Sequence, residues 1–489
     1  MGTVHAKSPD TDEGVGVKMD LQALKRLDAA REREIKRRLR LMRGRLAKLR
    51  AKAMNASLGN VKARVQRVHV DGLARTKDDI VINTVRDVFA AQDFQTVIMK
   101  IHEARTRLAG LGCFKDVGVF IDTYTGPDAL EDGIEVTFEV REVNLVGAKI
   151  NTSVGNNEGS VSTGGVMRNL LGRGEEAACE YSHGTKRTSS FHTTFTKPFH
   201  NDASTVLNSS VYQQASEAPW SGYKELDRGI LLSLAFNSAP NVQQKLILDG
   251  VWRHIACLSR STAFAVREQA GHSLKSSLRH ELKVDRRDDL VFPSDGVAFT
   301  LKNELAGLGG DIGFLKNEID LQVNVPLPKD IVIQGTLLAG HLLPLRNNKT
   351  HCITDRFLLG GPMNLRGFEM SGVGPHSDGC SLGADMYWAA ALHTYSPLPL
   401  LGRGGSISDK FRLHAFVNTG NIGDFVLTDD YRQNLQTLLR EVRLSYGAGL
   451  AMSLGGIARV ELNYCVPLLV QRGDRPSHGL QFGVAASFL

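Results

Sequence analysis

Residues 458–464 read A-R-V-E-L-N-Y and alternate apolar and polar residues with a period of two. Side chains along a β-strand point to opposite faces in turn, so one face of this segment is apolar. The other face carries Arg459, Glu461 and Asn463. The same alternation recurs at residues 384–394, 411–420 and 480–489. Polar faces rich in glycine and small residues are typical of strands that surround a wide polar lumen.

This alternation begins near Val146 and continues to the end of the chain, over about 340 residues. A membrane strand takes about 10 residues, or about 20 with its connection, which gives about 17 strands. Because single-chain barrels of the bacterial type have even strand counts, we expect 16. The sequence therefore predicts a mainly β chain with a 16-stranded transmembrane antiparallel barrel at residues 145–489.

Composition agrees with a membrane barrel without requiring one. Gly makes up 49 of 489 residues, above the usual ~7%. No apolar run reaches the ~18 residues of a transmembrane helix, and the N-terminus lacks the apolar region of a secretory signal. The six cysteines are scattered, which favours neither a zinc site nor a disulfide framework. No triad or metal-binding spacing is evident, so we predict no enzyme, no metal and no cofactor.

Residues 355–368 read D-R-F-L-L-G-G-P-M-N-L-R-G-F and follow neither a helical nor a strand period. They predict a long loop, around residues 345–380, between two strands. A lone Arg-Gly-Phe would favour a solvated surface loop. The paired glycines, Phe357 and Phe368 instead favour a loop that folds inward and carries Arg366 with it.

The N-terminal part differs in charge from the rest. Residues 1–17 are polar and acidic and are predicted to be disordered. Residues 18–52 hold 14 Lys or Arg against 4 Asp or Glu, with an apolar stripe at helical spacing. Together with a short linker, 18–60 is predicted to be a basic amphipathic helix, suited to an anionic membrane surface or a partner helix. A solvated helix and a transit peptide remain alternatives, whereas nucleic acid is disfavoured because no aromatic residues interleave the charges.

Residues 61–144 change to a pattern of alternating strands and helices. A strand near 65–70 precedes a helix that Thr76 is expected to cap, with Asp79 completing a capping box. A second helix ends at Gly112, and two strands follow at 117–121 and 134–140. The order β-α-α-β-β resembles a polypeptide-transport-associated (POTRA) domain, which offers a sheet edge to extended chains.

Several motifs together carry a resemblance to the outer-membrane barrel-assembly superfamily. They are the single POTRA-like domain, D-R-R-D-D-L-V-F-P-S-D-G at 285–296, the L-R-G-F loop, and a last strand that ends in Phe-Leu. Within this superfamily, the sequence more closely resembles the mitochondrial branch found in animals. The members of this branch are the central barrel subunits of the sorting and assembly machinery. The motifs for this branch are V-G-N-N-E-G-S (154–160), G-H-S-L-K-S-S-L (271–278), S-Y-G-A-G (445–449) and I-A-R-V-E-L-N-Y-C-V-P (457–467). The basic arm at 18–52 departs from this branch.

The resemblance implies a multi-pass barrel in the mitochondrial outer membrane with its N-terminus in the intermembrane space. There it would fold and insert β-barrel precursor proteins at a lateral gate, by pairing their C-terminal strand with its own edge. The implied partners are metaxin-type subunits, the cristae-organising complex of the inner membrane and membrane lipid, with no nucleic acid. The main alternative is a passive polypeptide-translocating channel, and a soluble ligand-binding sandwich is a distant third.

In this family, the Arg of the loop folds into the lumen against acidic groups. The partner motif F-x-D-x-G reads F-V-N-T-G at 416–420, so Asn418 replaces the acid. Asp385 and Glu461 both lie on predicted lumen faces, and the sequence leaves open which of them pairs with Arg366. The expected loop anchor comprises Leu365, Arg366, Gly367, Phe368, Asp385, Asn418 and Glu461.

The gate is expected between the first barrel strand, near 147–155, and the last, near 480–489. The end of the chain fits the polar-x-Gly-x-x-apolar-x-apolar sorting signal of mitochondrial barrels. The residues expected at the gate and in precursor pairing are Lys149, Ile150, Asn151, Thr152, Ser153, Val154, Gln481, Gly483, Ala486 and Phe488. Glycines at the two strands would weaken the gate. Ordinary crowding inside a barrel explains these glycines equally well.

Overall fold

A computed structural model describes residues 61–155, 158–185, 188–199, 202–345, 351–398, 410–425, 430–455 and 458–485. The acidic tail and the basic helix predicted over residues 1–60 lie outside these ranges. Two compact units are present, each described here by itself. One contains the described residues up to His69 with Val85–Ala104 and Val119–Phe138, and the other contains Val70–Thr84, Arg105–Gly118 and Glu139–Leu489. None of the described helices has both the length and the apolar character to cross a membrane.

The N-terminal elements follow the predicted order β-α-α-β-β. They are β1 (Arg64–Asp71), α2 (Asp78–Val85) with the 3₁₀ turn η1 (Arg86–Ala90), α3 (Phe94–Gly110), β2 (Phe114–Thr123) and β3 (Gly133–Glu142). The strands form a sheet of order β1-β3-β2. Val136 and Phe138 on β3 are fully buried, as is Leu108 on α3, so the apolar faces of sheet and helix are both covered.

The first helix does not begin as the sequence predicts. It starts at Asp78, and Thr76 directs its backbone N–H and its hydroxyl to the Glu142 carboxylate, at 2.8 and 2.7 Å. Ala74 and Arg75 donate their backbone N–H groups to the same carboxylate. Burial raises the pKa of Glu142, but these hydrogen bonds outweigh burial and lower the pKa to about 2. The predicted capping box at Thr76 was therefore wrong, because a distant carboxylate takes the donors of this turn.

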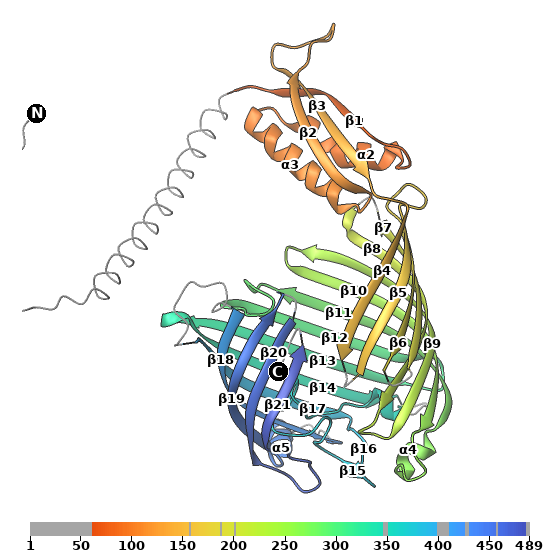
Figure 1. The fold of residues 1–489 in the computed structure, drawn as a ribbon, viewed down its shortest axis with the longest axis vertical. Helices are drawn as coiled ribbons and strands as arrows, with labels where there is room; N and C mark the ends of the chain where they lie inside the picture. Colours follow the sequence, from red (N-terminus) through yellow and green to blue (C-terminus); the bar gives the residue numbers. More distant parts are fainter. Residues whose placement is uncertain are drawn as a thin grey trace, which may run out of the picture. The chain divides into compact units, whose positions relative to one another are not determined.

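The described residues from Val146 onward contain one 16-stranded antiparallel sheet, which confirms the predicted strand count and fold (Figure 1). The strands are β4 (Val146–Gly155), β5 (Glu158–Arg168), β6 (Glu176–Gly184), β7 (Ser189–Phe199), β8 (Asp202–Ala218), β9 (Tyr223–Ala239), β10 (Val242–Cys257), β11 (Gly271–Asp285), β12 (Gly296–Gly310), β13 (Phe314–Leu327), β14 (Ile331–Pro344), β17 (Met386–Pro397), β18 (Phe411–Gly423), β19 (Arg443–Leu454), β20 (Ala458–Leu469) and β21 (Gly479–Ala485). Each strand pairs with the next in sequence, except that β14 pairs with β17 across a long connection.

The shorter elements all lie in the connections between barrel strands. They are α4 (Phe264–Glu268), η2 (Pro328–Asp330), η3 (Ile353–Asp355), the two-residue strands β15 (His376–Ser377) and β16 (Cys380–Ser381), and α5 (Tyr431–Leu439). The strands β15 and β16 pair only with each other, in a small sheet within the β14–β17 connection. The described part of this connection, residues 351–385, is therefore a structure of its own rather than a bare turn.

Side chains on the barrel strands separate by polarity as the two-residue period predicts. On β20, Glu461 and Asn463 are 1% and 2% exposed, whereas the neighbouring Leu462 and Tyr464 are 46% and 58% exposed. Strand β18 behaves alike: His414 and Asn418 are buried, and Leu413 and Val417 are exposed. An apolar outer face around a polar interior is the arrangement of a transmembrane barrel.

The two ends of the barrel sheet are β4 and β21, which we call the seam. The sheet order runs without a break from β21 to β4, and no ladder joins these two strands within the described residues. Figure 1 shows β21, coloured violet-blue, and β4, coloured gold, as the end strands of the wall. Ile150 on β4 is 76% exposed and Leu480 on β21 is 71% exposed. Both end strands therefore present open apolar side chains on the outer face.

Candidate functional site

The connection from β14 to β17, at residues 351–385, fills part of the barrel interior; we call it the lumen loop. Leu359, Leu365 and Phe368 are each at most 1% exposed. They pack in one cluster with Phe314 on β13 and Leu342 on β14. The first residues of the predicted loop, 346–350, lie outside the described chain. Burial of these three apolar side chains is what keeps the loop within the lumen.

Arg366 lies at the tip of the lumen loop, which we define as residues 365–368. Its side chain is fully buried, and its Nη2 and Nε lie 2.9 and 3.3 Å from Oε2 of Glu461 on β20. The guanidinium carbon lies 5.0 Å from the ring centre of Phe416. Arg459 Nε lies 2.9 Å from the other carboxylate oxygen, so Glu461 sits between two arginines. Of the two acids that the sequence left open, Glu461 is the partner of Arg366.

Asp385 does not contact Arg366 and forms ion pairs with other residues of the lumen loop. Its Oδ1 is 3.0 Å from His351 Nε2 and 3.2 Å from Arg356 Nε, both within the lumen loop. Burial raises the pKa of Asp385, but the hydrogen bond from His351 and the charge of Arg356 outweigh burial and lower it. Asp385 thus ties the end of the loop to its beginning and does not join the Arg366 cluster.

Asn418 contacts the backbone of the loop tip and not the charged group of Arg366. The Asn418 side-chain nitrogen donates to the Arg366 carbonyl at 3.2 Å, and the Ser445 hydroxyl donates to the same oxygen. A carboxylate at position 418 has no hydrogen to donate at neutral pH, so Asn changes the chemistry of the F-x-D-x-G motif. Gly367 has a φ of +88°, and a Cβ there would lie 2.9 Å from Ser445 Cβ. Glycine is therefore required at this position.

Gln481 links the loop tip to the last barrel strand, β21. Its side-chain oxygen accepts the Gly367 N–H at 3.0 Å, and its nitrogen donates to the Phe368 carbonyl at 2.9 Å. One amide side chain thereby satisfies one backbone donor and one backbone acceptor, both buried. A loop residue, Phe368, also forms an isolated β-bridge with Pro476, just before β21. The predicted sorting-signal residue Gln481 is thus in contact with the predicted anchor.

A chain of buried polar groups extends from Glu461 across the wall, and the sequence reasoning missed it. Asn463 donates to Glu461 Oε2 at 2.9 Å, and its oxygen is 2.9 Å from Nδ1 of His414. His414 Nε2 lies 2.9 Å from Nδ1 of His393 on β17. The Asn463 oxygen accepts, so His414 carries its proton on Nδ1 and accepts from His393 on Nε2. The available signal was two histidines on the lumen faces of neighbouring strands.

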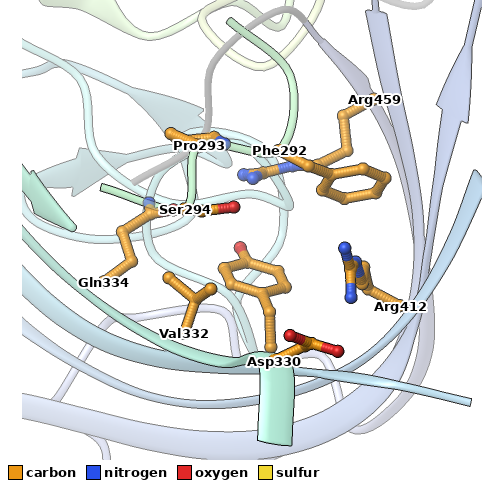
Figure 2. A pocket seen from close by; sticks show the side chains of 9 residues that line it. Phe292, Pro293, Ser294, Asp330, Val332, Gln334, Arg412 and Arg459 are labelled. Atoms are coloured by element: carbon orange, nitrogen blue, oxygen red, sulfur yellow. The ribbon is translucent and has the colours of Figure 1, made fainter. Parts of the chain in front are cut away.

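The motif at 285–296 lies beside the Glu461 cluster, at the end of the barrel where β14 begins. Its residues 292–294 border a small pocket, which Figure 2 shows in close view. Arg459 lies over the ring of Tyr395 at 5.2 Å, and Phe292 packs against that ring with centres 6.4 Å apart. The enclosed space is about 10 Å³, roughly enough for one water. The pocket is lined by Phe292, Pro293, Ser294, Asp330, Val332, Gln334, Tyr395, Arg412 and Arg459.

The described residues among those expected at the gate lie on the two seam strands. On β4, Lys149 Nζ is 3.4 Å from Glu176 on β6, and Asn151 and Thr152 are exposed. Ser153 and Val154 belong to β4, but their side chains are outside the description. Gly483 lies on the buried face of β21, next to Gln481 on the same face. Ala486 and Phe488 lie outside the described residues. Within the described chain, no cluster of His, Cys, Asp or Glu is arranged to hold a metal.

Comparison with known proteins places this architecture among membrane barrels. Residues 169–488 match the family model of the Omp85 superfamily domain. The solved structure of BamA from Haemophilus ducreyi lacking POTRA domains 1–3 has a similar fold, with a TM-score of 0.69 and 17% identity, covering 86% of this chain and 84% of that one. This likeness supports the fold of the barrel.

Similarity in sequence extends over most of the chain. The sorting and assembly machinery component 50 homologue of Bos taurus is 45% identical over 87% of this chain and 90% of its own, and that of Homo sapiens is 44% identical over the same shares. A SAM50-like protein of Drosophila melanogaster is 33% identical, over 88% and 96%. The chain belongs to the Omp85 superfamily, and within it to the family of sorting and assembly machinery component 50 homologues.

Proposed function

We propose that this chain folds and inserts β-barrel precursors into the mitochondrial outer membrane, as the central barrel subunit of a sorting and assembly machinery. Membership of this family supports an assembly role in an outer membrane, and the names of the relatives support the machinery. The observation that carries the mechanism is the asymmetry of the seam. Gln481 joins β21 to the lumen loop from within, whereas Lys149 on β4 pairs with Glu176 of the wall itself.

An exposed β4 edge is suited to template a new strand. Each backbone N–H or C=O left unpaired in lipid costs several kcal/mol, so a precursor does not insert strand by strand without help. When β4 parts from β21, its free edge offers a row of such groups. The C-terminal strand of a precursor pairs with that row, as extended chains pair with open sheet edges elsewhere. The β4 edge thereby stays paired with the precursor until the precursor's own first and last strands pair and close its barrel.

The lumen loop supports an insertase over a passive channel. Arg366 and Phe368 are fully buried in the barrel interior, where a conducting pore needs open space. The loop tip is held by Asn418, Ser445 and Glu461 on β18, β19 and β20, so it stays in place when the seam opens. We therefore assign the loop the task of holding the fixed side of the gate.

We propose the remaining partners and the orientation from the family. The elements β1 to β3 act as a POTRA domain in the intermembrane space, and their order β-α-α-β-β supports this assignment. Metaxin-type subunits, the cristae-organising complex and membrane lipid complete the surroundings. Protease added to intact mitochondria should spare residues 1–140 and digest them after rupture of the outer membrane. Digestion in intact organelles would contradict the orientation.

Depletion of the protein tests the function itself. Radiolabelled porin precursor should accumulate unassembled in depleted mitochondria, while a presequence-bearing matrix protein is still imported in the first hours. Re-expression of the wild-type chain serves as the control. Early loss of presequence import with normal porin assembly would favour the passive channel instead.

A further inference from the structure

The lumen loop is held at a second place, at its beginning, by an acid that neither the sequence motifs nor the gate explains. Asp355 ends the turn η3 and is 4% exposed. Its Oδ1 lies 2.9 Å from Lys275 Nζ on β11 and 3.2 Å from Arg253 Nη1 on β10. The Asp355 backbone carbonyl accepts a further bond, at 2.9 Å, from Lys316 on β13. Side chains from three strands, β10, β11 and β13, therefore bind Asp355.

The two cations that bind the Asp355 side chain are themselves paired on the wall. Arg253 Nε lies 2.7 Å from Glu225 on β9, and Lys275 Nζ lies 2.9 Å from Glu304 on β12. These pairs remain if the Asp355 charge is removed, because no member of them is left alone. The wall thus supplies acidic partners for both cations by itself, and Asp355 of the loop is a further one.

The two anchors grip different parts of the sheet. The Asp355 cluster uses β9 to β13, whereas the Arg366 cluster uses β18, β19, β20 and, through Gln481, β21. Strands β14 and β17 lie between the two groups in the sheet order. The stretch from Asp355 to Arg366 therefore spans the interior as a tie between two parts of the wall.

A buried ionic cluster of this kind is suited to fix a position. Desolvation cancels most of the attraction within a buried ion pair, so the cluster adds little net stability. Its directional contacts nevertheless allow the loop a single placement. We propose that Asp355 is a positioning residue, which fixes the beginning of the lumen loop on β10, β11 and β13 so that the tip meets Gln481 on β21.

This inference rests on the proposed function and deepens it: precursor assembly depends on a residue that contacts no part of the seam. Asp355→Asn tests it, since the amide keeps the shape of the side chain and removes its charge. Glu369→Gln is the matched control, because Glu369 lies in the same loop, is exposed, and forms no side-chain hydrogen bond or ion pair with the described residues. Both variants are studied in the full chain within its complex.

Two readouts are compared, the rate of porin precursor assembly and hydrogen exchange along the loop. Asp355→Asn should slow assembly about tenfold, equivalent to ~1.4 kcal/mol. It should also speed amide exchange at the tip, residues 365–368, while exchange in β20 stays at the wild-type level. Glu369→Gln should change neither. A purely structural role would raise exchange throughout the barrel instead.

Asp355→Glu keeps the inference testable if the asparagine variant fails to accumulate. The longer acid retains the charge, so it should restore protein levels, while its added length should raise tip exchange above the wild-type level. Normal tip exchange in Asp355→Asn, or in Asp355→Glu where the asparagine variant does not accumulate, would overturn the positioning role. A wild-type chain that assembles no precursor would instead refute the proposed function, and the exchange result would still stand.

Discussion

The two strands of the seam differ in how they are held. The lumen face of β21 is fastened by Gln481, whose amide makes two buried hydrogen bonds with the loop tip. Along β4, the side chains of Lys149, Ile150 and Asn151 are all exposed, and Lys149 makes one surface ion pair, with Glu176. A surface pair of this kind contributes at most about 1 kcal/mol. One side of the seam is thus secured from inside the barrel and the other side depends on its neighbour β5.

This difference assigns separate tasks to the two edges. A template for new strands must expose its backbone groups repeatedly without unfolding, which suits β4 with its full ladder to β5. The opposite edge must keep its place while the seam is open, which suits β21 with its tie to the loop. We call β21 with its contacts to the loop the fixed side of the seam, and β4 the free side. The first three variants below remove or weaken contacts of the fixed side, and the last one changes the segment that leads into β4.

Loss of Arg366 should break the fixed side most severely. Arg366→Ala removes the partner of a fully buried carboxylate, a change that costs ~3–5 kcal/mol in general, although Arg459 still neutralises part of Glu461. We expect precursor assembly to fall by about 100-fold, with a smaller fall in protein abundance. Arg366→Lys should recover only part of the activity, because an ammonium does not reproduce the forked donors. Full assembly by the alanine variant would remove the loop anchor from the mechanism.

Gln481→Leu should release β21 from the loop while leaving the anchor intact. The Gly367 N–H and the Phe368 carbonyl would each lose a buried partner, at ~1–3 kcal/mol apiece. Amide exchange in β21 should rise by about tenfold or more, whereas exchange at Arg366 changes little. Phe482→Leu, on the outer face of the same strand, is the control. Equal exchange in the two variants would show that the loop does not hold β21.

Asn418→Asp tests the fixed side more gently by restoring the acid of the family motif. A carboxylate at this position loses the bond to the Arg366 carbonyl and faces that oxygen instead, at a cost of ~1–3 kcal/mol. Precursor assembly should therefore slow by about tenfold, measured beside Asn418→Ser as a smaller donor. Faster assembly in the aspartate variant would mean that charge pairing with Arg366 outweighs the carbonyl contact.

Glu142 lies just before β4, and its effect on the free side should be the smallest. Its lowered pKa of about 2 means that its contribution to stability is complete above the ordinary value of about 4.3. That contribution disappears as the pH falls through about 2. In thermal unfolding of the full chain, Glu142→Gln should be less stable than wild type at neutral pH, and the gap should narrow below about pH 4. A gap that does not depend on pH would show that the charge is not what the Thr76 turn binds.

The strands were predictable from the sequence because their signal is local. A period of two assigns each residue to a face, so the lumen positions of Glu461, Asn463 and His414 and the outward position of Leu462 followed from neighbouring residues alone. The glycine-rich break at 359–361 likewise indicated a loop before any contact was known. These features need no knowledge of which strand lies opposite.

The contacts of the lumen loop were not predictable in the same way. Both Glu461 and Asp385 lie on lumen faces in the alternating pattern, so the pattern does not show which acid pairs with Arg366. That assignment requires the position of the loop tip inside the barrel. No role was predicted for Asp355, because nothing near it in sequence indicates Arg253 or Lys275. Thr76 was misassigned for a related reason, since its competing acceptor Glu142 lies 66 residues away. Sequence patterns thus located the site, while its pairings depended on the fold.

Sealing the seam with a disulfide tests the central claim most directly. Cysteine pairs are placed along residues 149–152 of β4 and 480–484 of β21, in several registers, and the pair that oxidises most completely is used. The account predicts that the oxidised barrel stops maturation of porin precursor, that reduction restores it, and that single cysteines at the same positions cross-link to the precursor's C-terminal strand. Normal maturation by a fully oxidised barrel would contradict it.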